Sequence, residues 1–147
     1  MPQGSFSATV SGWAAETQQR TEAVFKMAAQ DVINESRKPV AKGGNMPVDT
    51  GFLRASLDVN LSGNLPATRK NEGKVPPPQD ISLAIAQAEL GQTIYASYTA
   101  NYALHQEYGA RGRPGRAFVR LAAQRWQTIV NNAARRLQRK VKARQSR

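Results

Sequence analysis

One stretch, residues 101–126, constrains the fold of this chain most, because it joins two segments of opposite character. It begins with aromatic residues at Tyr102 and Tyr108, continues through a Gly/Arg/Pro segment from Gly109 to Gly115, and ends inside a helical pattern. The first 107 residues hold nine Lys/Arg and ten Asp/Glu, whereas the last 40 hold twelve Lys/Arg and no acidic residue. We therefore predict that a hinge joins a nearly neutral folded body to a cationic helical arm.

The N-terminal third has the pattern of a long amphipathic helix. Its apolar and small residues recur at spacings of three and four, which places them on one face of a helix. We predict that this helix starts near Ser7 or Ser11, reaches about Glu35, ends before Pro39 and also contacts another subunit. Residues 1–5 should be loose. The predicted face consists of Val10, Trp13, Ala14, Thr17, Thr21, Val24, Ala28 and Val32.

The middle of the chain alternates short elements with turns. Asp49 or Thr50 can cap a short helical turn, and the alternation that follows predicts a half-buried strand over residues 57–61. A proline- and glycine-containing surface loop spans residues 62–79, and Asp80 should cap a short helix over residues 81–90. Residues 93–99 are rich in β-branched and aromatic side chains, which favours a second strand paired with the first. A helical turn then begins at Asn101 and ends at Gly109.

The C-terminal region predicts one long helix that begins between Pro114 and Ala117. Its apolar face stops after Leu137, because cations occupy the equivalent positions beyond that residue. We therefore assign residues 1–137 to a single domain and residues 138–147 to a basic extension that projects from the domain or frays. The predicted apolar face consists of Phe118, Ala122, Trp126, Ile129, Ala133 and Leu137.

Composition narrows the class of protein. A chain of 147 residues is long enough to fold as one compact domain without disulfides or a structural metal ion. The absence of cysteine excludes disulfides and thiolate metal sites. A reducing cytoplasm or an assembled particle fits this composition better than secretion. No apolar run approaches the ~20 residues of a membrane helix, and the first ten residues have no signal-peptide pattern, so we expect no membrane contact. The net charge of +11 favours a polyanion or an acidic partner.

Two groups of cations are candidate contacts with DNA or with a protein partner. The first lies between Gly109 and Arg116, where arginines on a helix N-terminus can hold phosphates, although the Lys-Ser/Thr ending of a nucleotide-binding loop is missing. The second is the densest basic run, which lacks aromatic residues and would bind nucleic acid without base stacking. Contact with DNA backbone and contact with acidic groups of a neighbouring subunit both stay open. The candidates are Arg111, Arg113, Arg116, Arg135, Arg136, Arg139, Lys140, Lys142 and Arg144.

No catalytic, cofactor or metal site is expected. Asp49-Thr50-Gly51 is also the triplet of aspartic proteases, but no apolar strand leads into it and a helix start follows. His105 is the only histidine, and neither a metal site nor a nucleophilic triad can be assembled around it. We expect a structural role for both.

Short motifs follow one another in a defined order. They are Pro47-Val48-Asp49-Thr50-Gly51-Phe52-Leu53-Arg54-Ala55-Ser56-Leu57, Gly91-Gln92-Thr93-Ile94-Tyr95, Asn101-Tyr102-Ala103, Glu107-Tyr108-Gly109, and a helix start with Phe118 and Val119. In this order and spacing they resemble the small neck and tail-completion proteins of long-tailed bacteriophages. The resemblance covers roughly residues 46–129, and the order carries it because each motif alone is short. Its structural motif residues are Asp49, Thr50, Gly51, Tyr102, Glu107 and Gly109.

The resemblance implies an α+β fold, in which a small antiparallel sheet is flanked by the long N-terminal helix, short helices and the long basic C-terminal helix. It also implies a virion structural protein without catalytic activity, which forms a homo-oligomeric ring, expected to be hexameric, at the head-tail junction. Such a ring would aid tail attachment and DNA retention.

The expected partners are neighbouring neck, portal-side or tail-tube proteins and the backbone of packaged DNA. The expected location is the virion, with the host cytoplasm as the site of assembly. The motifs do not predict the basic C-terminal extension. The alternative is therefore a nonspecific DNA-binding protein that acts through its basic arm.

Overall fold

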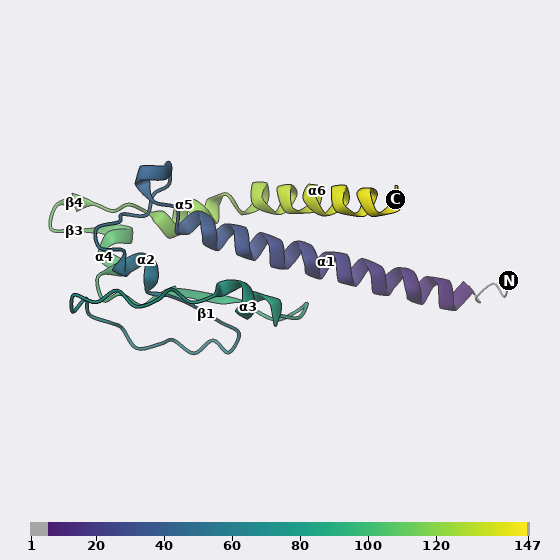
Figure 1. Cartoon of the computed structure of the whole chain (residues 1–147), viewed down its shortest axis with the longest axis horizontal. Helices are drawn as coiled ribbons and strands as arrows, with labels where there is room; N and C mark the ends of the chain where they lie inside the picture. The colour runs from purple at the N-terminus through teal and green to yellow at the C-terminus, as the bar shows by residue number, and fades with distance from the viewer. Residues whose placement is uncertain (1–5, 147) are drawn as a thin grey trace.

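The computed structural model describes residues 6–146, so the predicted loose residues 1–5 lie outside the described residues. A long helix, α1 (Phe6–Ser36), forms the axis of the molecule, and the other elements gather along its C-terminal half (Figure 1). The predicted α+β fold is confirmed. The remaining elements are η1 (Val40–Lys42), α2 (Phe52–Ala55), β1 (Leu57–Asn60), α3 (Ile81–Ala86), β2 (Tyr95–Tyr98), α4 (Ala103–Tyr108), β3 (Gly109–Ala110), β4 (Arg113–Pro114), α5 (Phe118–Gln124) and α6 (Trp126–Gln145).

The first predicted strand pair is present. Strands β1 and β2 are antiparallel, with Leu57 opposite Tyr98 and Asn60 opposite Tyr95. Along β1, Leu57 and Val59 are buried and their neighbours half-buried, because successive side chains point to opposite faces of a sheet. The alternation in the sequence therefore predicted both the strand and its buried face.

The loop over residues 62–79 is mostly exposed, as predicted, but it is tied to the sheet at two points. The side-chain amide of Gln79 accepts from Val59 N at 2.7 Å and donates to Val59 O at 3.0 Å, so it pairs with β1 as a strand would. Arg69 N donates to Thr99 O at 2.7 Å just beyond β2. These bonds satisfy backbone groups that a two-stranded sheet would leave open.

Short helices pack the sheet and the end of α1 into two apolar clusters. The first joins Ile33 of α1 to the sheet and α3, and the second joins α2, the end of β2 and the start of α5. Asp80 caps α3 as predicted, since its Oδ1 accepts from Ser82 N at 3.1 Å, but α3 ends at Ala86 rather than near residue 90. The first cluster contains Ile33, Leu57, Val59, Ile81 and Ile85, and the second Met46, Phe52, Leu53, Ala100 and Phe118.

Most of the predicted apolar face of α1 is exposed in the single chain, because five of its eight residues are exposed and only Ala28 is fully buried. Ala28 is fully buried, whereas Val10 is 45% exposed and Trp13 is 68% exposed. The reason is that α1 extends beyond the folded body, so within residues 6–146 no other helix or strand lies beside its first turns (Figure 1). The helical periodicity was correct, but it does not say whether a partner lies in the same chain.

The single predicted C-terminal helix is wrong, because the chain bends at Arg125. There ψ is 5°, and Arg125 N donates to Ala122 O at 3.1 Å, which closes α5 before α6 begins. Trp126, predicted on the buried face, is consequently 40% exposed, while Ile129 and Ala133 pack against Ala28 of α1. Pro114 lies in β4 rather than in the first turn of a helix.

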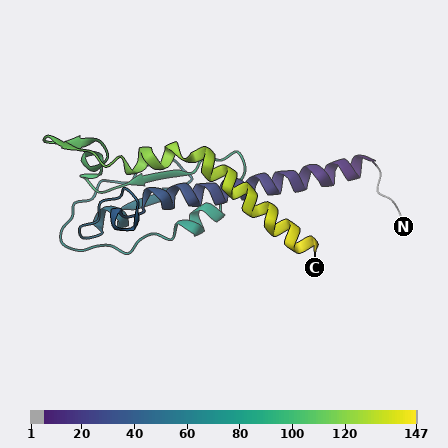
Figure 2. The ribbon, with the colours of Figure 1, turned by 90° about the horizontal axis from the view of Figure 1, so that it is seen from above.

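The direction of α6 follows from this bend. Figure 2 shows α6 crossing α1 and then diverging from it toward the C-terminus. The helix continues past residue 137 without interruption as far as Gln145. Beyond Leu137 its residues are exposed, except for the half-buried Val141.

Candidate functional site

Glu107 connects α4 to the start of α5. Its side chain is 8% exposed, and its two carboxylate oxygens accept from Val119 N at 2.9 Å and from Arg120 N at 3.0 Å. The N-cap position, Ala117, offers no side-chain acceptor of its own. Glu107 therefore supplies the missing cap from a distance, and its negative charge lies at the positive end of α5.

Arg120 closes the same contact from the other side. Its Nε donates to Glu107 Oε1 at 2.9 Å, its Nη2 donates to Glu107 O at 2.8 Å, and its guanidinium lies 4.3 Å from the centre of the Tyr108 ring. Both oxygens of the buried carboxylate thus accept hydrogen bonds, which its burial requires. The arrangement gives the Glu107-Tyr108-Gly109 motif a structural role.

The segment predicted as a hinge is a hydrogen-bonded hairpin, β3–β4. Gly109 pairs with Pro114 and Ala110 with Arg113. The two turn residues, Arg111 and Gly112, have φ values of 52° and 75°, as a two-residue type I′ turn requires. Gly109 has a φ of 94°, and a Cβ there would lie 2.5 Å from Arg113 O, so only glycine fits.

The hairpin presents the first group of predicted contact residues. Arg111, Arg113 and Arg116 are exposed and, together with His105, line an open concavity of about 700 Å³. Within residues 6–146 none of these arginines forms an ion pair. The concavity can therefore accept phosphate or carboxylate groups, because free guanidinium groups bind both.

The Asp49-Thr50-Gly51 motif starts α2, and Thr50 accepts a backbone N–H there as predicted, although Gly51 is the N-cap residue. Gly51 occupies the N-cap position with a φ of 87°, and Phe52 N donates to Thr50 Oγ1 at 3.3 Å. Tyr102 of the next motif packs its ring 6.2 Å from that of Phe52. Burial raises the pKa of Tyr102 above its ordinary value. The two motifs therefore meet in one cluster.

The basic run on α6 divides into two parts. Arg136 pairs with Asp31 of α1, so this predicted contact residue is engaged within the chain. The other predicted contacts, Arg135, Arg139, Lys140, Lys142 and Arg144, are exposed, and none forms an ion pair within the described residues. Arg125, at the bend, pairs with Glu35. The two ion pairs hold the first half of α6 on α1 and leave the second half cationic.

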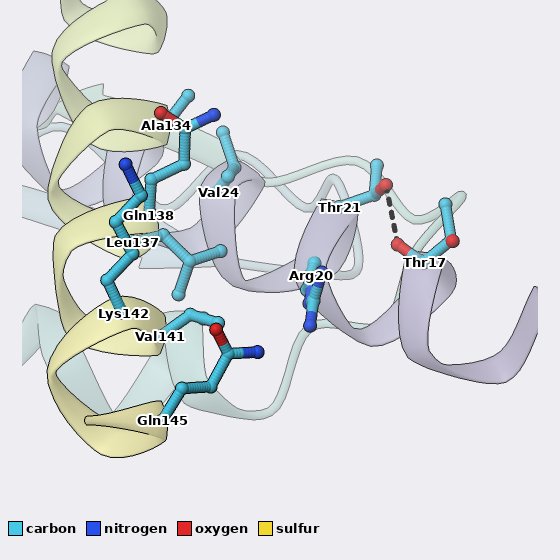
Figure 3. A pocket seen from close by; sticks show the side chains of 10 residues that line it. All are labelled: Thr17, Arg20, Thr21, Val24, Ala134, Leu137, Gln138, Val141, Lys142 and Gln145. Carbon is cyan, nitrogen blue, oxygen red and sulfur yellow. Dashed lines mark hydrogen bonds between the residues drawn. The ribbon is translucent and has the colours of Figure 1, made fainter. Parts of the chain in front are cut away.

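A groove opens between α1 and α6 where the two helices separate. It has a volume of about 630 Å³ and is lined only by these two helices. In Figure 3, Leu137 and Val141 project from α6 into the space beside Val24 and Thr21 of α1. Arg20 and Lys142 lie among the same lining residues. The lining of the groove is therefore mostly apolar or uncharged, and its two charged residues are both cations.

Sequence reasoning missed a cationic cluster at the C-terminal end of α1. Arg37 Nε is buried without a hydrogen-bond partner among the described residues, and burial followed by repulsion from Arg54 lowers its pKa. These two residues line a concavity of about 600 Å³ with Lys38 and Lys42, and the ion pairs Arg125–Glu35 and Arg136–Asp31 line it as well. No local pattern announces this cluster, because Arg37 and Arg54 belong to different elements.

Tyr98 is a second buried polar group that the sequence did not reveal. Its hydroxyl is hydrogen-bonded to Ser36 Oγ at 2.7 Å, and its ring meets Phe118 edge to face at 5.1 Å. Burial raises the pKa of Tyr98 to about 12, although the bond to Ser36 opposes the shift. The hydroxyl therefore stays protonated and links α1 to β2.

Comparison of the chain with protein-family models, with curated proteins and with solved structures gave no match. Within residues 6–146 no cluster of three or more His, Asp or Glu side chains is placed to hold a metal ion. None of the helices in that range combines the length and the apolar character that crossing a bilayer requires.

Proposed function

We propose that the chain is a structural protein of a phage virion, a neck or tail-completion component that forms a homo-oligomeric ring at the head-tail junction. The order of its motifs supports this proposal, and so do their positions in the fold. Phe52, Tyr102 and Phe118 come from three separate motifs and pack in one cluster. Such motifs define a fold rather than a reaction centre, which suits a protein that works by assembly.

The observation that carries the proposal is the apolar surface that a single copy leaves uncovered. Trp13 and Val10 are exposed on α1, and the apolar groove between α1 and α6 lies on the same side of that helix. Exposed apolar surface of this kind marks a contact with another protein. Assembly with further copies would remove it from water.

The cationic surfaces fit the neighbours expected at that place in a virion. Six copies of the arm would bring about seventy positive charges around one axis, a density that requires packaged DNA or acidic partners nearby. The proposed partners are neighbouring neck, portal-side or tail-tube proteins and the DNA backbone. The proposed location is the virion, after assembly in the host cytoplasm.

Two measurements test the proposal. The mass of the purified chain, followed by light scattering over a range of concentrations, should rise toward that of a closed ring. Electron microscopy of particles that carry a tagged copy should place the tag at the head-tail junction, and particles without the chain should lose tails or DNA. A chain that stays monomeric and is absent from particles contradicts the proposal.

The second candidate is a nonspecific DNA-binding protein, which the unpaired cations on α6 favour. The triple variant Arg139→Gln, Lys140→Gln, Arg144→Gln removes three exposed charges and leaves the groove residues in place. For DNA binding through phosphates, the slope of log K against log salt should become less steep by about 0.9 for each lost contact. If the triple variant no longer binds DNA and the wild-type protein does not assemble, the second candidate replaces the first.

A further inference from the structure

We infer that the groove between α1 and α6 is the docking site for the N-terminal part of α1 from a neighbouring copy. We call this part, Ser7–Glu16, the stalk. The inference rests on the proposed assembly function and goes further, because it identifies the two surfaces that meet between copies.

The groove needs an occupant that is apolar and long. Ala133 is buried against Ala28, but beyond this contact α6 diverges from α1 (Figure 2), so open space separates Leu137 and Val141 from Val24 and Thr21 (Figure 3). The described chain contributes only α1 and α6 to the lining. A segment from outside must therefore fill the space if these side chains are to be buried.

The stalk offers the matching apolar face. At 100° per residue, Val10, Trp13 and Ala14 continue the face on which Thr17, Thr21 and Val24 line the groove. All stalk side chains described are exposed, and Trp13 is the most exposed of the large ones. A large aromatic side chain in water at 68% exposure is a typical anchor for a protein contact.

Length and charge agree with this pairing. The α6 wall of the groove, from Ala134 to Gln145, is about 17 Å long and the stalk about 14 Å, at 1.5 Å per residue. Glu16 is the only charged residue of the stalk, whereas the two charged residues that line the groove, Arg20 and Lys142, are both cations. The weak negative charge of the stalk therefore suits the cations of the groove.

The arrangement is also geometrically consistent with a ring. Each copy inserts its stalk, residues 7–16, into the groove of one neighbour. Its own groove is lined by residues from Thr17 onward, so the same copy can accept the stalk of another neighbour at the same time. A contact between two different surfaces of the same protein propagates head to tail and closes when the rotation permits.

The chain contains no cysteine, so engineered disulfides can test the contact directly. One variant carries Ala14→Cys in the stalk and a second carries Gln138→Cys in the groove. After the two are mixed and oxidised, we expect most of the limiting variant to form a mixed disulfide. The control pairs Ala14→Cys with Thr68→Cys, at an exposed position of the 62–79 loop, and should give at least tenfold less. Efficient dimers of Ala14→Cys alone would show that stalks pair with each other, and would overturn the inference.

A second readout uses fluorescence and affinity. Trp126→Phe leaves Trp13 as the only tryptophan, and its emission should shift to shorter wavelength as assembly proceeds. Trp13→Ala should raise the dissociation constant of assembly about tenfold or more, whereas the control Leu65→Ala, at a site that is 85% exposed, should not. Equal effects of the two substitutions would contradict the docking.

The outcomes separate the two proposals. Rings without the mixed disulfide overturn the docking and leave the proposed function standing. Dimers with two exchanged stalks support the docking and contradict the ring. A chain that is monomeric at every concentration overturns both.

Discussion

Replacing Glu107 by alanine should destabilise the fold more than the loss of one short side chain would suggest. The substitution leaves Val119 N and Arg120 N at the start of α5 without their acceptor. These two bonds are both the cap of α5 and charge-assisted hydrogen bonds, so their loss costs about 1.5–3 kcal/mol. The Arg120 ion pair adds at most about 1 kcal/mol, because the arginine side chain is 48% exposed to solvent. We expect a total loss of about 2–4 kcal/mol in the free energy of unfolding, a large part of the usual 5–15 kcal/mol.

The measurement is urea unfolding at a concentration where light scattering finds monomers. With a slope of about 2 kcal/mol per molar urea, the midpoint should fall by about 1–2 M. Arg120→Met is the matched control, since it removes the guanidinium but keeps both amides capped, and it should cost only about 1 kcal/mol. Glu107→Gln should fall between the two, because its amide retains one acceptor oxygen. The reasoning is refuted if Glu107→Ala lies within about 0.5 kcal/mol of wild type, or if Arg120→Met costs as much.

Two further changes test other parts of the fold. Gly115→Ala should lower the free energy of unfolding, measured in urea, by about 2–3 kcal/mol, since its Cβ would lie 2.2 Å from Glu107 O. The control Gly12→Ala, whose Cβ would meet no heavy atom of the described residues within 4 Å outside its own helical turn, should be neutral or stabilise by up to about 1 kcal/mol. Equal losses would contradict the close approach. Burial raises the pKa of Tyr98 to about 12 from an ordinary value of 10. The tyrosine therefore ionises at a lower pH in the unfolded chain than in the folded one. The free energy of unfolding should have its full value below about pH 10 and should fall between about pH 10 and 12, by up to about 1.4 kcal/mol per pH unit. Unfolding measured across this range should show a smaller slope in Tyr98→Phe, and an unchanged slope would contradict the assignment.

The sequence predicted the elements whose signals are local. Alternation over residues 57–61 identified β1 and its buried face, and Asp80 identified the start of α3. The end of α1 before Pro39 followed from the missing amide of proline. These signals act within a few residues of each other, so no knowledge of the rest of the chain was needed.

The site was predictable only in part. The arginines from Arg111 to Arg116 were recognised as exposed cations, but their place on a tight hairpin depends on the close approach of Gly109 and Gly115 to the backbone of neighbouring residues. Glu107 belonged to a recognised motif, yet its task as a cap for α5 could not be read from residues 12 positions apart.

By itself, then, the amino-acid sequence determined the long N-terminal helix and the β1–β2 pair, where the positive charge gathers, and that α1 carries an apolar face. Only the tertiary structure decided that most of this face is left in water, that the last helix bends at Arg125, and that Arg136 pairs with Asp31 105 positions away. The physical reason is the distance along the chain over which each effect acts. Periodicity and capping act over a single helical turn, whereas the angle between α1 and α6, and the groove it opens, result from all the packing contacts and ion pairs between them.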